Sequence, residues 1–559
     1  MNSIKYALLS LVLFAAAFGL AAQAPQWLWA VGAGGTADDY AWDIVVDSQG
    51  NQYVTGSFIG TSTFGAITLT SSGGTDIFIA KLDPQGNWLW AVKAGGTGDD
   101  EGSGICVDAS GKVYVTGYFT DSASFGAGTL IGNGAEDIFF VKLNTNGVWQ
   151  MLAQAGGSGF DVGIEIALDN LGNAYITGVF TSVCGFGALN LTSAGMEDTF
   201  VAKLGTNGSW HWATKAGGAA SDAGKDIAVD GSGNVCITGI FDGGIDFGTI
   251  NLTGSGGLDV FAAKLTSAGN WQWATAAGGT GDEESYRIAE DGSGNSYIVG
   301  YFEGTANFGN VTLNSSGQLD AFIASLDGNG NWLWATKGGG ASIDGCYGLA
   351  VDSYANIFVC GGFGSSASFG STVLTSTGAY DVFTAKLDSA GNWLWAVSAG
   401  GSSYDVGWGI GVDNSSHAYL AGVFRGTAGF GTSSVICNGG WDLFVAKLFE
   451  TVGVSDEIAP SAPSVVLTAS PNPFHEVIVL KAIPASQSPL LCNEAYIGIY
   501  DMKGRKVTTL PFDSSSTGEM GCTWNGRDTN DRLCPNGIYL ARFVADGKAL
   551  SSVRISLIK

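Results

Sequence analysis

Short apolar stretches separated by polar turns run along most of the chain. One group of four is Trp88–Ala94, Gly102–Asp108, Val113–Phe119 and Asp137–Leu143. These stretches are rich in β-branched and aromatic residues and are bounded by Gly, Asn, Asp and Ser, which is the pattern of β-strands joined by tight turns. The period of an amphipathic helix is absent from them. The pattern therefore predicts an all-β fold.

The whole group of strands returns every 61 residues, with no insertion or deletion. A tryptophan opens each of seven units, at positions 27, 88, 149, 210, 271, 332 and 393. Several strands are apolar on both faces, so each sheet must be covered on both sides. Four-stranded sheets packed face to face around an axis satisfy this requirement. Residues 27–453 are therefore predicted to form a seven-bladed β-propeller.

The position of small residues predicts the order of the strands within a blade. The segment that ends at Asp47 carries Val, Cys, Ala or Gly at the position of Val45, which suits a crowded axis, so we expect it to be innermost. The Tyr-rich segment is then second, the Asp-x-Phe segment third and the Trp-x-Trp segment outermost. On this order, Trp27–Val31 completes the last blade beside Asp442–Leu448 and removes two free sheet edges. An open solenoid is the alternative.

The first 22 residues have the pattern of a signal peptide. Lys5 precedes an apolar run, 7–20, with the length of a signal-peptide core, and small residues follow it. The run is short for a membrane span, and no later segment is long and apolar enough to be one. We therefore expect export to the extracellular space or the outer cell surface.

Composition excludes one class of partner. The chain has 24 Lys and Arg against 50 Asp and Glu, for a formal net charge of −26. Binding to phosphate groups requires clustered Lys and Arg, so nucleic acids are not expected partners.

A motif in the repeats resembles a known family. The pattern VD-x-x-GN-x-YVTG runs from Val46 to Gly56, and returns from Val107 to Gly117 with Lys112 in place of Asn. It resembles the SBBP repeat of seven-bladed propellers and is similar to the broader NHL-type blade. The resemblance implies a fold but no particular activity.

The repeat stops after Gly453. Residues 454–465 are expected to be a linker, and 466–559 contain alternating strands that predict a small β-sandwich. This region resembles the type IX secretion C-terminal sorting domain, which is related to the immunoglobulin-like domain of hook-capping proteins. The resemblance implies export by a type IX-like route and contact with the secretion machinery. The matching residues are Pro471, Asn472, Pro473, Phe474, Gly504, Gly537, Tyr539 and Lys559.

Two further features of this region leave alternatives open. The segment from Trp524 to Asp528 is closer to the hook-capping domain, so a structural immunoglobulin-like domain that is not removed is the alternative. Cys522 and Cys534 flank this segment and are candidates for a disulfide bond across it.

Acidic residues recur at three positions of the repeat, which we name by their first members. The Asp39 set is Asp39, Asp100, Asp161, Asp222, Glu283, Asp344 and Asp405. The Asp47 set is Asp47, Asp108, Asp169, Asp230, Asp291, Asp352 and Asp413. The Asp76 set is Asp76, Asp137, Asp198, Asp259, Asp320, Asp381 and Asp442.

These sets receive different interpretations. Carboxylates suit Ca²⁺ and sugar hydroxyls, so the Asp39 set is the candidate ligand-binding set, with Ca²⁺ as the one ion considered. The alternative for this set is turn capping, which is the role expected of the Asp47 and Asp76 sets. No other cofactor and no dedicated metal site is expected, because the three histidines and nine cysteines lack zinc-site spacing.

The sequence contains no distinctive catalytic constellation. We therefore predict a binding or scaffold protein that recognises an extracellular glycan or a surface protein through loops that differ between repeats. Exposed aromatic residues would mark such loops, and the candidates are Tyr40, Phe160, Tyr286, Tyr380, Tyr404 and Trp441. A passive structural surface protein is one alternative, and an enzyme acting on polysaccharide through acids in the channel is another.

Overall fold

The computed structural model describes residues 25–449, 465–484, 495–501, 505–511, 513–514, 520–545 and 548–558. The expected signal peptide (1–22), linker residues 454–464, Gly504 and Lys559 lie outside these residues. The described chain falls into two compact units that part near residue 453. All of its named elements are β-strands. Within the described residues, no helix has the length and apolar character of a membrane span.

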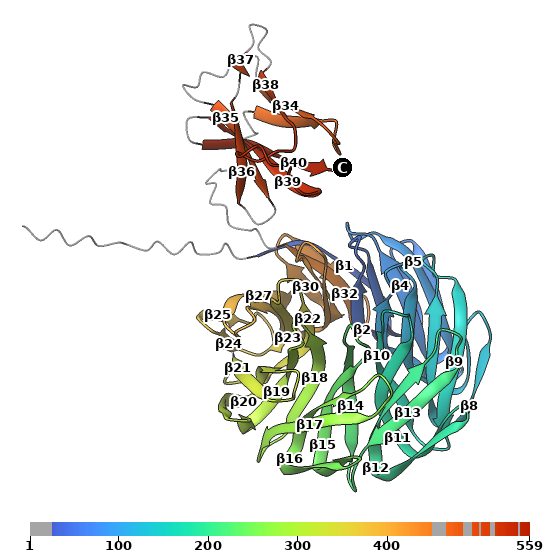
Figure 1. The fold of residues 1–559 in the computed structure, drawn as a ribbon. Helices are drawn as coiled ribbons and strands as arrows, with labels where there is room; N and C mark the ends of the chain where they lie inside the picture. Colours follow the sequence, from blue (N-terminus) through green and yellow to red (C-terminus); the bar gives the residue numbers. More distant parts are fainter. Residues whose placement is uncertain are drawn as a thin grey trace, which may run out of the picture. The chain divides into compact units, whose positions relative to one another are not determined.

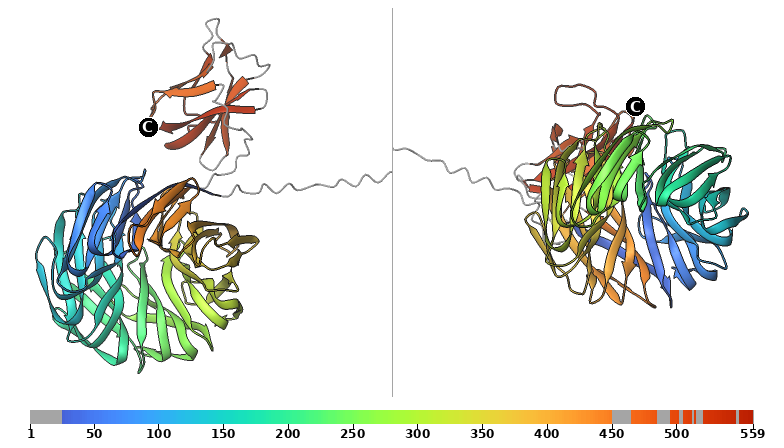
Figure 2. Two further views of the ribbon diagram at one scale, coloured as in Figure 1. Left: turned by 180° about the vertical axis from the view of Figure 1, so that it is seen from behind. Right: turned by 90° about the horizontal axis from the view of Figure 1, so that it is seen from below.

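The first unit repeats one antiparallel sheet around an axis (Figures 1 and 2). In every repeat one strand lies at the axis. This inner strand begins at the acid of the Asp39 set or, in the second repeat, one residue after it. Each of these strands contacts the next, and β2 contacts β28, so the first and last repeats are neighbours. The inner strands are β2 (Asp39–Val46), β6 (Glu101–Val107), β10 (Asp161–Leu168), β14 (Asp222–Val229), β18 (Glu283–Glu290), β22 (Asp344–Val351) and β28 (Asp405–Val412).

The second and third strands of each repeat form a long hairpin. In the first five repeats both strands are continuous, and in the last two each is split into two short strands. The second strands are β3 (Gln52–Phe64), β7 (Val113–Ser124), β11 (Ala174–Phe186), β15 (Val235–Phe247), β19 (Ser296–Phe308), β23 (Ile357–Phe363) with β24 (Ser366–Phe369), and β29 (Ala418–Phe424) with β30 (Thr427–Phe430). The third strands are β4 (Ile67–Leu82), β8 (Thr129–Leu143), β12 (Leu189–Leu204), β16 (Ile250–Leu265), β20 (Val311–Leu326), β25 (Thr372–Thr375) with β26 (Asp381–Leu387), and β31 (Ser433–Ile436) with β32 (Asp442–Phe449).

The outer strands carry the repeated tryptophans. The strand β1 pairs with β32 from Gln26↔Phe449 to Ala33↔Leu443, so the N-terminal strand completes the last sheet as the strand order predicted. The outer strands are β1 (Gln26–Gly35), β5 (Trp88–Gly96), β9 (Trp149–Gly157), β13 (Trp210–Ala216), β17 (Trp271–Gly279), β21 (Trp332–Gly340) and β27 (Trp393–Gly401).

The long hairpins differ from the sequence-based expectation of separate seven-residue strands. Beyond Phe58, β3 continues to Phe64 and pairs Thr61–Phe64 with Ile67–Thr70 of β4. The tip of this hairpin also pairs with the end of β1, through Gly34↔Thr63 and Gly35↔Ser62. Neighbouring sheets are therefore joined by backbone hydrogen bonds as well as by packing.

The repeated aromatic residues pack between sheets. In the first repeat, the Phe64 ring lies 5.0 Å from that of Phe78 and 5.2 Å, edge to face, from that of Trp88. Both phenylalanines are fully buried. These rings belong to a core cluster that also contains Tyr419 and Leu443 of the last repeat. The Trp and Phe repeats are therefore core residues between neighbouring sheets.

Every inner strand contains a β-bulge at the same place. In β2 the pairing with β3 shifts between Ala41 and Asp43, which leaves Trp42 as the extra residue. A bulge turns the extra side chain away from its regular direction. The bulged strand also approaches its neighbour closely: a Cβ atom at Gly56 would overlap the carbonyl oxygen of Tyr40. The same overlap exists in all seven repeats, which explains the repeated glycine.

Replacing Gly300 by Ala should therefore destabilise the protein by about 3 kcal/mol, because the methyl group meets the carbonyl of Glu284 and the ring of Phe322. Gly292→Ala is the matched control in the same repeat, since nothing lies within 4 Å of its added Cβ and its cost should stay within about 0.5 kcal/mol. Chemical denaturation of both variants measures the difference. Equal midpoints would contradict the close approach at the bulge.

The second unit is a β-sandwich of two four-stranded antiparallel sheets, β33-β34-β38-β37 and β36-β35-β39-β40. Both sheets contribute to one core, in which Phe474, Trp524 and Tyr539 meet. The strands are β33 (Val465–Ser470), β34 (Ile478–Pro484), β35 (Ala495–Asp501), β36 (Lys506–Pro511), β37 (Asp513–Ser514), β38 (Met520–Trp524), β39 (Gly537–Ala545) and β40 (Lys548–Leu557).

The motif residues of this unit have structural contacts. Asn472 accepts a hydrogen bond from the backbone N–H of Ser556 (2.8 Å) and donates one to the carbonyl of Arg554 (2.8 Å). Pro471 and Pro473 flank it, and Phe474 is fully buried. The hydroxyl of Tyr539, two residues after Gly537, donates to the carbonyl of Pro535 (2.8 Å).

Cys522 and Cys534 are candidates for a disulfide bond from the sequence, and the structure does not contain this bond. Cys522 is a free thiol, and burial raises its pKa to about 11. The backbone pairing keeps the two cysteines out of register, because the backbone N–H of Cys534 donates a hydrogen bond to the carbonyl of Gly526 (2.8 Å). Cys534 therefore lies opposite a residue four positions beyond Cys522.

Candidate functional site

The seven acids of the Asp39 set are fully buried, so they do not form an exposed ring. In each repeat the carboxylate accepts a hydrogen bond from the backbone N–H four residues earlier; Asp39, for example, accepts from Gly35 at 2.7 Å. Burial raises the pKa values of these acids to about 6 or 7. The carboxylates thus bind the backbone of turns, which is the alternative role considered for this set.

The Asp76 set is buried beside the Asp39 set. Each of these carboxylates also accepts the backbone N–H four residues earlier, as Asp76 does from Ser72 at 2.9 Å. A lysine of the next outer strand pairs with three of them, in the repeats of Asp76, Asp198 and Asp320. Both sets thus accept hydrogen bonds from the backbone of turns.

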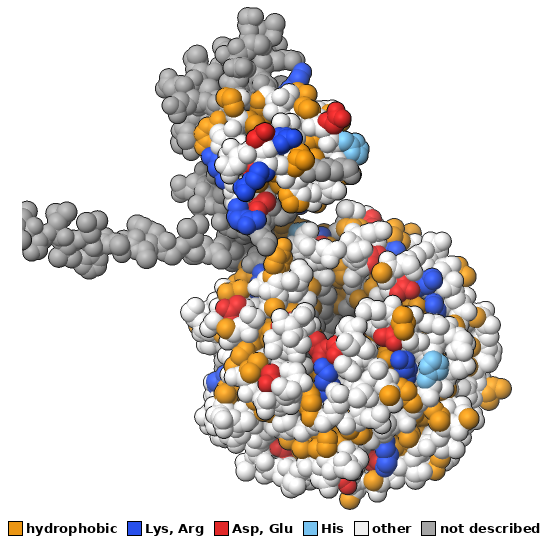
Figure 3. All heavy atoms as spheres, in the orientation of Figure 1, with side chains coloured by type: hydrophobic (Ala, Val, Ile, Leu, Met, Phe, Trp, Pro, Cys, Tyr) orange, Lys and Arg blue, Asp and Glu red, His pale blue; other side chains and the backbone are white. Residues whose placement is uncertain are grey.

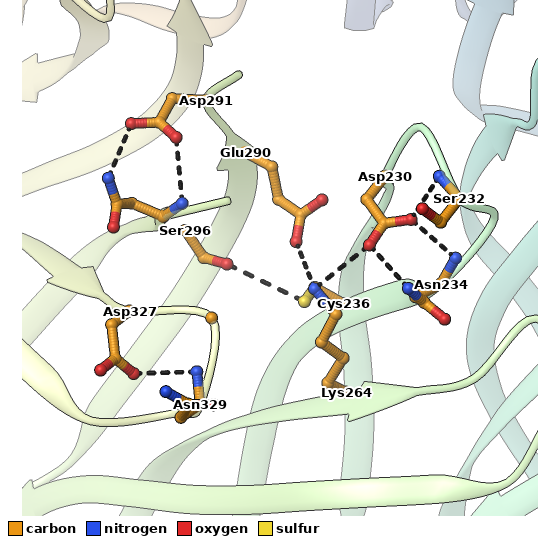
Figure 4. A network of polar contacts seen from close by, with 12 residues as sticks. Asp230, Ser232, Asn234, Cys236, Lys264, Glu290, Asp291, Ser296, Asp327 and Asn329 are labelled. Atoms are coloured by element: carbon orange, nitrogen blue, oxygen red, sulfur yellow. Dashed lines mark hydrogen bonds and ion pairs between the residues drawn. The ribbon is translucent and has the colours of Figure 1, made fainter. Parts of the chain in front are cut away.

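The Asp47 set organises the turn between the first and second strands. Asp230 accepts the backbone N–H groups of Ser232 and Asn234, both at 2.9 Å, and the side-chain amide of Asn234 (Figure 4). Lys264 lies between Asp230 (3.4 Å) and Glu290 (3.2 Å). Equivalent bonds hold the other turns of the set. Among the described residues, no group of three or more His, Cys, Asp or Glu is arranged to hold a metal ion.

The strongest site candidate is a cavity of about 320 Å³ at the axis, to which all seven inner strands contribute side chains. Figure 3 shows the first unit hollowed near its middle, with acidic and basic side chains at the edge of the hollow. The lining residues are Trp42, Glu101, Ser103, Val162, Ile164, Glu165, Lys225, Tyr286, Arg287, Tyr347 and Trp408.

Four aromatic rings form a continuous arc on one side of this cavity. The ring centroids of Trp42 and Trp408 are 5.4 Å apart, those of Trp408 and Tyr347 are 4.6 Å apart, and those of Tyr347 and Tyr286 are 4.9 Å apart. Tyr40 stacks on Trp42 with an interplanar angle of 5°. The rings come from the inner strands of the last three repeats and of the first, so the arc covers about half of the axis.

The rest of the lining is charged or aliphatic. Burial raises the pKa of Glu101 to about 7, and the Ser57 hydroxyl, 3.5 Å away, partly offsets this rise. Lys225 lies 5.9 Å from the centroid of the Tyr286 ring and forms no ion pair with a described residue. A ligand in the cavity would therefore meet an aromatic wall, a carboxyl group near neutrality and an ammonium group.

A layer of buried charges lies next to this cavity. Arg287 pairs with Glu165 and with Asp43 (3.0 Å), and these residues also line a second cavity of about 150 Å³ together with Asp226. Burial raises the pKa of Asp226 well above its usual range and also raises that of Asp43, which Arg287 opposes. Asp226 accepts the backbone N–H of Ile288 at 2.6 Å. One guanidinium thus pairs with two buried carboxyl groups, and a third, that of Asp226, lines the same small cavity.

Sequence reasoning missed most of this site because it searched for repeated residues. The bulge position is occupied in turn by Trp42, Ser103, Ile164, Lys225, Tyr286, Tyr347 and Trp408. This variation inside a strand whose neighbours repeat is the signal that could have identified the site. Of the six aromatic residues considered from the sequence, Tyr286 lines the cavity and Tyr40 stacks on Trp42. Tyr380, Tyr404 and Trp441 form a second row, which meets the arc where the hydroxyl groups of Tyr380 and Tyr347 lie 3.3 Å apart. Tyr404 is 50% exposed, and Phe160 is 36% exposed elsewhere.

No family model matches the chain. Over 471 residues it is 27% identical to an uncharacterized WD repeat-containing protein of Acanthamoeba polyphaga mimivirus, covering 69% of this chain and 33% of that protein. It is 25% identical over 518 residues to the regulatory protein FlaEY of Caulobacter vibrioides, covering 86% of this chain and 52% of FlaEY. The chain thus spans a third to a half of the length of these relatives.

Similarity to solved structures is weak. Puromycin hydrolase aligns with a TM-score of 0.38 and 10% identity, over 81% of this chain and 61% of that structure. A DUF4221 family member from Bacteroides vulgatus aligns with a TM-score of 0.26 and 8% identity, over 60% of this chain and 92% of that structure. These scores are too low for an inference about this chain. The repeated antiparallel sheets around an axis, together with the WD-repeat relative, identify the chain as a β-propeller-type repeat protein.

Proposed function

We propose that this protein is an exported binding protein whose axial cavity takes a carbohydrate residue of an extracellular glycan. The observation that carries the proposal is the arc of Trp42, Trp408, Tyr347 and Tyr286 along one side of the cavity. Sugar rings expose apolar C–H faces that stack on aromatic rings. Their hydroxyl groups exchange hydrogen bonds with carboxyl and ammonium groups, which Glu101 and Lys225 supply on the other side.

The size of the cavity limits the ligand. Its volume of about 320 Å³ lies at the lower end of the ~300–1,000 Å³ usual for small-molecule pockets. A terminal sugar or a disaccharide suits this volume better than an internal segment of a rigid polymer. The mixture of apolar rings and a few polar groups is also the usual composition of a ligand pocket.

The finer architecture belongs to the same proposal. The ring is a seven-bladed propeller of the SBBP type, closed by β1, and the second unit is an immunoglobulin-like sorting domain of the type IX secretion route. Support comes from the seven inner strands in mutual contact and from the motif residues around Phe474 in the sandwich core. Export would start with the signal peptide 1–22.

A glycan array probed with the full chain tests the proposed binding, with Ca²⁺ and again with EDTA. We expect hits whose affinity falls at least tenfold in Trp408→Ala, because a central aromatic anchor typically contributes 2 kcal/mol or more to binding. Trp441→Ala is the control, since this tryptophan is not among the residues that line the cavity, and the variant should bind like the native chain. If the native chain binds with Ca²⁺ but not with EDTA, the binding site would instead be a Ca²⁺ site formed by acidic residues.

An array without hits would contradict the proposal and favour a passive structural protein or a protein partner. One observation favours a catalytic variant of the function: Glu101, with its pKa near 7, and Glu165, paired with Arg287, both line the cavity. Carboxyl groups in such unlike environments suit acid–base chemistry on a glycosidic bond. Release of reducing ends from an array hit, abolished in Glu101→Gln, would show that activity.

A further inference from the structure

The axial cavity lies near the end of the first unit at which the inner strands begin. Its lining comes from the first five residues of these strands, such as Val162, Ile164 and Glu165 of β10. The charged layer and the smaller cavity of about 150 Å³ lie farther along the same strands. A glycan that places its end in the larger cavity therefore leaves it past the turns that precede the inner strands, and the residues of these turns decide its direction.

Each of these turns meets the turn before the third strand of the preceding repeat, and we call this meeting place a junction. At one junction the backbone N–H of Asp405 donates to the carbonyl of Tyr380 (2.8 Å), as that of Asp100 does to Thr75 (2.8 Å) at another. The residues before the two acids face each other there, and Tyr380 with Tyr404 is the one pair in which both are aromatic. The other pairs are Thr75 with Asp99, Glu136 with Phe160, Glu197 with Ser221, Leu258 with Asp282, Leu319 with Ile343, and Trp441 with Asp38.

The junction of Tyr380 and Tyr404 continues the aromatic arc of the cavity. The hydroxyl groups of Tyr380 and Tyr347 lie 3.3 Å apart, and Tyr347 belongs to the arc. The ring centroids of Tyr380 and Tyr404 lie 6.5 Å apart, with an interplanar angle of 37°. Because Tyr404 is 50% exposed, its ring is available to a ligand. Tyr347, Tyr380 and Tyr404 thus form an aromatic path from the cavity to the surface.

A glycine makes room for this path. A Cβ atom at Gly362 would overlap the ring of Tyr380, so the ring rests directly on the backbone of β23. The path ends at Tyr404, because beyond it the guanidinium of Arg425 lies over the ring of Trp441, 5.9 Å from its centroid. The other six repeats carry a side chain at the position of Gly362, namely Ser57, Tyr118, Val179, Ile240, Tyr301 and Val423.

We infer that the ligand is a linear oligosaccharide longer than a disaccharide, whose end lies in the axial cavity and whose next residues leave it over Tyr380 and Tyr404. The inference rests on the proposed glycan binding and adds the length and the direction of the glycan. Sugar rings stack their C–H faces on aromatic rings, and Tyr404 supplies such a ring where the chain leaves the cavity. Every other junction has at most one aromatic residue, so it offers no continuation of the arc.

The test uses two fragments of the glycan that gives the strongest array signal, a disaccharide and a pentasaccharide that both keep its terminal residue. Calorimetry with the full chain measures both affinities. The native chain should bind the pentasaccharide about fivefold more tightly or better, since a stacked aromatic ring adds to its binding. Tyr404→Ala should lose most of this advantage and leave the affinity for the disaccharide unchanged. Tyr404→Phe keeps the ring and should keep the advantage.

Tyr354→Ala is the matched control. Tyr354 is 65% exposed in the turn that follows β22, at the opposite end of the inner strands, so both affinities should stay unchanged. Trp408→Ala should weaken both fragments alike, because this ring lines the cavity itself. Equal affinity of the native chain for the two fragments, or an advantage that survives in Tyr404→Ala, would overturn the inference while the proposed glycan binding stands. An array without hits would overturn both.

Discussion

The protein should resist heat better at pH 5 than at pH 8. In the folded state burial holds the pKa values of the Asp39 set at about 6 or 7. In the unfolded chain the same groups titrate near their ordinary values of about 4. Between pH 4 and 7 the folded state therefore binds more protons, and the free energy of unfolding falls as the pH rises through this interval. Seven such sites should raise Tm by roughly 5–10 °C from pH 8 to pH 5.

Two controls separate this effect from general charge repulsion, since the chain carries a net charge of −26. Salt at 0.5 M screens exposed charges far more than buried ones, so most of the shift should survive it. Asp405→Asn keeps an oxygen that accepts the N–H of Gly401 and removes the charge. This variant should gain stability at pH 8 and change little at pH 5. A flat profile of Tm against pH would contradict the prediction.

Replacing Arg287 by Met should cost about 3–5 kcal/mol of stability at pH 7, because it leaves buried carboxyl groups without their cation. Arg287 pairs with Asp43 and Glu165, and its side chain is 16% exposed. The loss should shrink at pH 5, since burial raises the pKa values of Asp43 and Asp226 and both groups accept protons more readily there. Denaturant midpoints at the two pH values measure this.

Arg425 provides the matched control for Arg287. It is the second arginine of the repeats, lies 5.9 Å from the Trp441 ring centroid and is exposed. Arg425→Met should cost less than about 1 kcal/mol at either pH. Equal losses for the two variants would show that the buried charge layer contributes nothing specific.

Much of the fold follows from the sequence because comparing the seven repeats with one another shows which positions require a particular kind of residue. The 61-residue period, the small residues of the inner segment and the tryptophan strand at the start predicted the strand order and the pairing of β1 with β32. The long hairpins were not predicted. The outer halves of these hairpins, such as Ser62–Phe64, contain too few alternating polar and apolar residues to be distinguished from a turn in the sequence. Their pairing with Gly34 and Gly35 also depends on the neighbouring sheet.

The site was less predictable than the fold. The sequence drew attention to the repeated acids, yet their burial shows that repetition marks turns and sheet contacts. The bulge at Trp42 cannot be read from the sequence, because a bulge changes side-chain direction without requiring a particular residue type. Once the bulge is known, the varied residues at this position become the lining of one cavity.

The pairing of β1 with β32 means that the last sheet cannot be completed until β32 has been synthesised. Gln26–Ala33 is synthesised roughly 410 residues before its partner strand, Leu443–Phe449. At ~5–20 residues per second, β1 waits about 20–80 s for its permanent neighbour. Throughout this time its tryptophan-rich edge is available to any other strand. A factor that shields nascent chains for a minute or more would therefore raise the yield of folded protein, and faster translation would shorten the exposure.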